Sequence, residues 1–157
     1  MLALVAVFTL WDAASAREIA LGDSLAVGLQ DRCKIPGNGQ IGRSPASVLR
    51  MIESLPPGQL AGATVILSSG ASNDPAHADL ALLQIAALKR AGTHVVVLLG
   101  VGDGVRNYAA VNRQLIRIAA ATGVPFVYGW RGVHPPDYPA VFAVAVDSAR
   151  RLAARTR

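Results

Sequence analysis

Short apolar runs alternate along the chain with longer segments in which apolar residues recur every three or four positions. The apolar runs at Thr64–Ser68, 94–99 and 125–128 predict buried strands. A fourth strand is expected at 17–21. A short edge strand is expected at 33–41, because one proline and two glycines interrupt that run.

Amphipathic helices are expected after these strands. In one of them Ser44 is the predicted N-cap, Pro45 takes the first helical position, and Pro56-Pro57-Gly58 stops the helix. Gly92 and Gly123 stop two others. Apolar residues at helical spacing, with one serine, define the buried faces: Val48, Ile52, Leu55; Ala81, Ile85, Leu88; Val111, Leu115, Ile118; Val141, Ala145, Ser148, Leu152.

Continuous apolar strands between amphipathic helices predict a parallel sheet covered by helices on both faces. The fold class is therefore a three-layer α/β/α sandwich with about five strands, and 157 residues are enough for one such domain. Ligands bind such sheets beyond the carboxyl ends of the strands. The loops at that edge are 22–25, 39–44, 69–74, 100–105 and 129–138.

Composition narrows the class of protein. Hydrophobic residues make up 52% of the chain and charged residues 16%, which is typical of a globular domain. The net charge is +5, but the basic residues form no stripe with interleaved aromatics, so no nucleic-acid partner is expected. Cys33 is the only cysteine, which excludes a disulfide framework and a cysteine metal cluster.

The first sixteen residues differ from the rest. Residues 2–10 are an unbroken run of small and apolar residues, and the Ala-Ser-Ala at 14–16 has the small-x-small form of a signal-peptidase site. The run is shorter than the roughly 20 residues that span a bilayer. We expect a signal peptide at 1–16 and an exported domain, periplasmic or secreted, at 17–157, without stable membrane insertion. No Lys or Arg precedes the run, and the alternative is a buried first strand or helix.

Ser24 and His134 are the candidate nucleophile and base. Ser24 lies in Gly22-Asp23-Ser24-Leu25, directly after the first expected strand, and His134 follows the last one. Both therefore fall at one sheet edge, where an imidazole can take the proton that makes a serine hydroxyl nucleophilic. The structural alternatives are a helix N-cap for Ser24 and an ordinary loop histidine for His134.

Acyl transfer also needs donors for the oxyanion of the tetrahedral intermediate. Three are available in the right loops: the N–H of Ser24, the N–H of Gly42 and the side-chain amide of Asn73. A turn glycine and a loop-capping asparagine are the alternative roles of the last two. Because Gly42 and Asn73 occur in the same set of loops as Ser24 and His134, an active site is favoured over these separate structural roles.

These blocks, in order, resemble the SGNH (GDSL-type) hydrolase family over essentially the whole of 17–157. Ser24 matches the nucleophile of the first block, Gly42 the second-block glycine, Asn73 the third-block asparagine and His134 the fifth-block histidine. The glycine before Asn73 lies one residue further away than in the usual G-x-N-D. The resemblance implies a flavodoxin-like sandwich and hydrolysis of esters or thioesters without metal or cofactor.

One position departs from the family pattern. The acid usually found three residues before the histidine is replaced by Arg131. An arginine cannot orient the imidazole or stabilise its charged form as a carboxylate does. A backbone carbonyl could orient His134 in a Ser–His dyad, Asp137 or Asp103 could come near as a third residue, or the protein is a weakened relative. Asp137 is also the expected N-cap of the last helix.

We therefore expect an ester hydrolase that acylates Ser24. The short chain suits small acyl groups such as acetyl esters on a sugar, so the expected partner is a small-molecule or glycan ester. Two alternatives remain. One is an acyl-thioesterase or lysophospholipase of the same family, and the other is a glycan-binding relative with weakened catalysis, suggested by Arg131.

Overall fold

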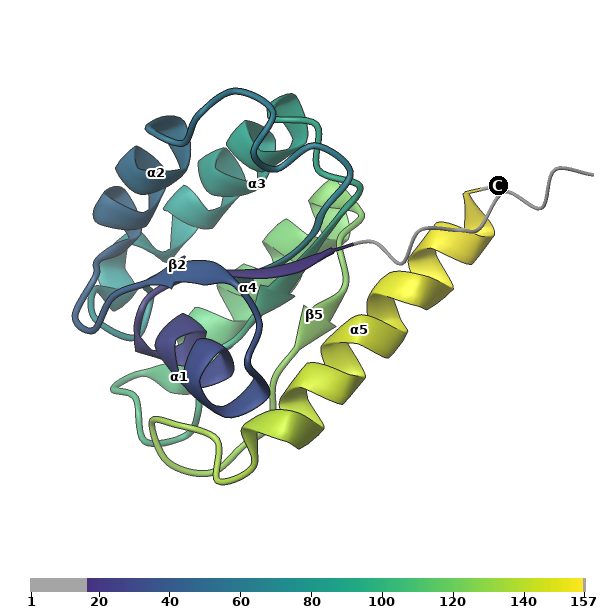
Figure 1. Cartoon of the computed structure of the whole chain (residues 1–157). Coiled ribbons are helices and arrows are strands. Elements are labelled where there is room, and N and C mark those ends of the chain that lie inside the picture. Colours follow the sequence, from purple (N-terminus) through teal and green to yellow (C-terminus); the bar gives the residue numbers. More distant parts are fainter. Residues whose placement is uncertain (1–16, 157) are drawn as a thin grey trace, which may run out of the picture.

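The computed structural model describes residues 17–156, and the predicted signal peptide lies outside the described residues. Five parallel strands form one sheet in the order β2-β1-β3-β4-β5 (Figure 1). Each predicted strand is present, with bounds that differ by a few residues at most for the four apolar runs. The strands are β1 Glu18–Gly22, β2 Gly37–Gly39, β3 Thr64–Ser68, β4 Val95–Leu99 and β5 Phe126–Val127.

Helices connect the strands, and their ends follow the predicted signals. The hydroxyl of Ser44 accepts from the N–H of Ser47, and Pro45 begins its helix. Gly92 and Gly123 both take positive φ at the stops of their helices. The helices are α1 Ser24–Cys33, α2 Pro45–Glu53, the 3₁₀ helix η1 Pro75–Leu80, α3 Ala81–Arg90, α4 Tyr108–Thr122 and α5 Tyr138–Arg155.

The sheet lies between two helical layers, which confirms the predicted three-layer sandwich. Helices α1 and α5 cover one face, and α2, α3 and α4 cover the other (Figure 1). Central strands β3 and β4 are buried along their whole length, as their continuous apolar sequences predict. Within residues 17–156, no helix combines the length and the apolar character needed to cross a membrane.

The strand order places the loops after β1 and β3 at the topological switch point of the sheet. From β1 the chain moves outward to β2, and it then returns to the other side of β1 to form β3. Connections of opposite sense leave a crevice at the carboxyl ends of such strands. Ser24 follows β1 and Asn73 follows β3, so both flank this crevice.

The loop after β3 passes very close to the loop before α2. A Cβ atom at Gly70 would lie 2.7 Å from the carbonyl carbon of Ser44 and 2.8 Å from the carbonyl oxygen of Arg43. Gly70 also has a φ of +83°, in the left-handed region that favours glycine. Only glycine allows this approach, which brings Asn73 to the loop of Gly42.

Gly70→Ala should therefore destabilise the protein more than Gly58→Ala. Gly58 is a matched control, because its φ is +78° and no atom lies within 4 Å of a Cβ built there. Left-handed backbone costs Gly58→Ala about 1–2 kcal/mol, and the clash should add about 1–3 kcal/mol at Gly70. Urea unfolding of both variants measures the difference. Equal losses would contradict the close approach of the two loops.

Candidate active site

The structure brings Ser24 and His134 together across 110 positions of sequence. Oγ of Ser24 lies 2.9 Å from Nε2 of His134. Ser24 is the first residue of α1, and the N-cap is Asp23, whose carboxylate accepts from the N–H of Leu25. The capping role considered for Ser24 is thus taken by its neighbour, which leaves the hydroxyl free to donate to His134.

Contacts with the loop after β4 and with Trp130 hold the loop that carries His134. The N–H of Gly132 donates to Oδ1 of Asp103 at 2.5 Å, and the indole N–H of Trp130 donates to the carbonyl of Val133 at 3.4 Å. A Cβ at Gly102 would lie 1.9 Å from the carbonyl oxygen of Gly132, so the loop after β4 touches this loop directly. His134 itself remains exposed.

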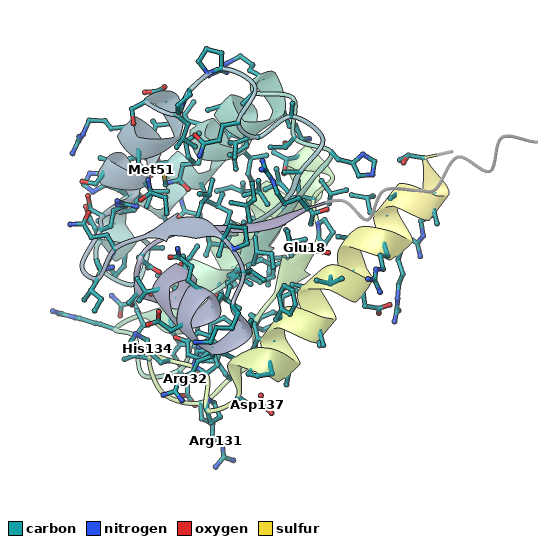
Figure 2. All side chains as sticks on the ribbon, viewed as in Figure 1. Glu18, Arg32, Met51, Arg131, His134 and Asp137 are labelled. Atoms are coloured by element: carbon teal, nitrogen blue, oxygen red, sulfur yellow. The ribbon has the colours of Figure 1, made fainter. Side chains whose placement is uncertain are left out.

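Neither candidate third acid is hydrogen-bonded to the imidazole. Oδ1 of Asp137 accepts from the N–H of Ala140 and caps α5, as predicted for that role. Asp103 supports Gly132 instead. Figure 2 shows His134, Arg131 and Asp137 at the same end of the molecule, with Arg131 pointing outward. Over residues 17–156, Ser24 is the only hydrogen-bond partner that the structure gives the His134 side chain.

Asp23 is buried beneath the site and connects several of its loops, a role that no sequence motif indicated. Its Oδ1 accepts from the Leu25 N–H at 3.0 Å and from the Ser68 hydroxyl at 2.5 Å, and its Oδ2 lies 3.5 Å from the amide nitrogen of Asn73. Burial raises the pKa of Asp23, and the hydrogen bonds from Ser68 and Leu25 and the charge of His134 oppose that rise. The loops after β1 and β3 thus share one carboxylate.

The three expected oxyanion donors lie in loops around Asp23. The Asn73 amide donates to the carbonyl of Arg43 at 3.1 Å, and its contact with Asp23 is long. The N–H of Ser24 is in the first turn of α1, where helical N–H groups have no intrahelical acceptor. Gly42 is exposed with a φ of +77°, and its N–H has no acceptor among the described residues.

Arg43 holds the Gly42 loop in place, a role that was not predicted from the sequence. Its guanidinium donates to the carbonyls of Gly22 at 3.1 Å and Asn38 at 2.9 Å, and to the side chains of Asn38 and Gln40. Partial burial lowers its pKa. These bonds tie the ends of β1 and β2 to the residue after Gly42. An arginine beside a predicted oxyanion glycine, with amide side chains just before it, was the available signal.

Solved structures resemble this chain in fold. A GDSL-like lipase from Bacteroides thetaiotaomicron has a TM-score of 0.60 and 17% identity, covering 87% of this chain and 88% of its own. A protein from Bacteroides fragilis that is designated an acylhydrolase has a TM-score of 0.59 and 19% identity, covering 90% of both chains. No family model matches the sequence, and no curated protein matches it.

These neighbours show the fold of the chain. The chain has the SGNH (GDSL-type) hydrolase fold, as the ordered motifs predicted. Its identity to both neighbours is below 20%, so the likeness concerns the fold, and the chemistry rests on the site. Within residues 17–156, no group of three or more His, Cys, Asp or Glu side chains is arranged to hold a metal ion.

Asp23→Asn should change the pH dependence of stability. A carboxyl whose pKa is raised by folding binds its proton more tightly in the folded state. Stability therefore falls as pH rises from the unfolded pKa, near 3.8, through the folded pKa. The free energy of unfolding of Asp23→Asn minus that of wild type should rise over this window and then level off. Asp31→Asn, at an exposed position, is the control. A flat or falling difference would contradict the pKa shift.

Proposed function

We propose that the protein is a serine hydrolase that cleaves carboxylic esters through an acyl-enzyme on Ser24. The observation that carries this proposal is the 2.9 Å contact between Oγ of Ser24 and Nε2 of His134, at the carboxyl ends of the strands. The two structural neighbours, a GDSL-like lipase and a designated acylhydrolase, support hydrolysis of this general kind. The predicted signal sequence supports the further proposal that it acts outside the cytoplasm.

The reaction has two halves that exchange one proton with His134. Oγ attacks the ester carbonyl while Nε2 takes the hydroxyl proton, and the collapse of the intermediate expels the alcohol, which receives that proton. Water then attacks the acyl-enzyme, gives a proton to Nε2, and releases the acid as the proton returns to Oγ.

The N–H groups of Ser24 and Gly42 and the side-chain amide of Asn73 donate hydrogen bonds to the oxyanion. The long contact of Asn73 with Asp23 leaves one amide hydrogen that an oxyanion can attract, while the bond to the Arg43 carbonyl keeps the side chain in place. Donors held before the reaction need no rearrangement when charge develops on the oxygen.

Small acyl groups, such as acetyl esters on carbohydrate, suit this site best. Asn73 and His134 are exposed, and Ser24 is partly exposed, so a bulky alcohol can approach. An acyl-thioesterase or lysophospholipase would use the same residues. A glycan-binding relative with weakened catalysis is the alternative that Arg131 favours, and it predicts binding without turnover.

Purified protein should hydrolyse p-nitrophenyl acetate. Ser24→Ala should lower kcat by at least about 10³-fold, because no other group among the described residues replaces the nucleophile. Initial rates at several substrate concentrations separate kcat from KM. Ser148→Ala, on α5 and away from the site, is the control and should retain full activity. Wild-type turnover no faster than buffer, or an active Ser24→Ala, would overturn the proposal.

The missing acid gives a second test. In a Ser–His dyad, Asp137→Asn and Asp103→Asn should keep most activity, since an asparagine oxygen can still accept from Ala140 or Gly132. His134→Ala should abolish it. Replacing the acid of a true triad can cost about 10⁴ in kcat. A loss on that scale in either asparagine variant would identify the third residue and contradict the dyad.

A further inference from the structure

A pocket lies beside the loop of His134, and none of Ser24, Gly42, Asn73 and His134 lines it. Its volume is about 480 Å³, within the range of small-molecule sites. The first half of α4 forms one wall, and the loops after β4 and β5 form the others. We call it the α4–β5 pocket and define it by six of its lining residues: Asp103, Tyr108, Arg113, Tyr128, Trp130 and Arg131.

The walls of the α4–β5 pocket are already fixed. The buried amide of Asn112 accepts from the N–H of Val101 at 2.9 Å and donates to the carbonyl of the same residue at 2.8 Å, which locks α4 to the loop after β4. Trp130 is buried, and a Cβ at Gly102 would lie 2.5 Å from its indole nitrogen. Fixed walls lower the entropic cost of binding.

Two tyrosine side chains at the mouth of the α4–β5 pocket are exposed. Tyr108 is 43% exposed and Tyr128 is 56% exposed. The ring of Tyr128 stacks on Phe126, with centroids 5.1 Å apart and planes at 29°, so its orientation is set while much of it remains open. Aromatic faces of this kind bind the apolar face of a flat or sugar ring.

The mouth also carries unpaired positive charge. Arg113 and Arg131 line it, and neither guanidinium forms a hydrogen bond or an ion pair with another residue in the described part of the chain. The one acid of the lining, Asp103, is engaged by Gly132. Guanidinium groups bind carboxylates through paired N–H donors. Arg131, which stands where the resemblance expects an acid, is therefore available to bind a carboxylate.

We propose that the α4–β5 pocket binds a carboxylate-bearing sugar unit, a uronate residue, of the glycan whose ester Ser24 cleaves. This inference rests on the proposed function. The segment from Tyr128 to Arg131 lines the pocket and continues within three residues to His134, so one extended glycan can occupy both places. The aromatic rings hold the sugar, and the two arginines select its charge.

Binding can be measured without catalysis. Calorimetry with Ser24→Ala protein should show that trigalacturonate binds and that neutral xylotriose binds at least about fivefold more weakly. Salt should reduce the difference, because exposed charges are screened. No binding of trigalacturonate, equal affinity for the two sugars, or tighter binding of acetyl-CoA, which would indicate a nucleotide site, would overturn the proposal.

Variants locate the binding. Arg113→Ala with Arg131→Ala should weaken trigalacturonate binding about five- to tenfold, the combined effect of two exposed ion pairs, and leave xylotriose binding unchanged. Arg117→Ala with Arg150→Ala removes the same charge outside the pocket and should have no effect. Equal losses in the two double variants would contradict the site. Sugar binding without p-nitrophenyl acetate turnover would reject the proposed hydrolysis alone.

Discussion

The buried carboxylate of Asp23 is the contact on which the site depends. It caps α1, accepts from Ser68 at the end of β3, and lies within reach of Asn73 in the next loop. Because it takes the capping role, the adjacent Ser24 hydroxyl is free to meet His134. Burying this carboxyl, whose pKa is raised, lowers the stability of the fold. The same carboxyl holds the loop of Ser24 and the loop of Asn73 in a fixed position relative to each other.

The rest of the site is built by loops that brace one another. Arg43 ties the Gly42 loop to the ends of β1 and β2, and Asp103 ties the loop after β4 to the loop of His134. The parallel sheet makes this bracing feasible, because the loops concerned all leave it at one edge. In this arrangement no described acid is hydrogen-bonded to His134. The imidazole is placed by its loop. Arg131 lines the α4–β5 pocket, and its side chain points away from the body of the molecule (Figure 2).

Sequence patterns predicted the fold well, because strand and helix signals here are local. Ser44-Pro45, Gly92 and Gly123 mark helix ends, and the apolar runs mark β3 and β4. The motif blocks likewise placed Ser24 and His134 at one edge. The roles of Asp23 and Arg43 could not be predicted, because they depend on contacts with residues distant in sequence: Ser68 and Asn73 for Asp23, and the Gly22 carbonyl for Arg43. The α4–β5 pocket depends on the packing of two loops against α4, which no periodicity encodes.

The central claim is that His134 activates Ser24 for attack on an acyl carbon, and covalent labelling tests it most directly. Folded wild-type protein treated with an alkyl fluorophosphonate should gain the mass of one adduct, which peptide mapping should place on Ser24. His134→Ala should label far more slowly, since the hydroxyl then lacks its base. Absence of an adduct on the folded protein, or an adduct at another serine with Ser24 unmodified, would contradict the account.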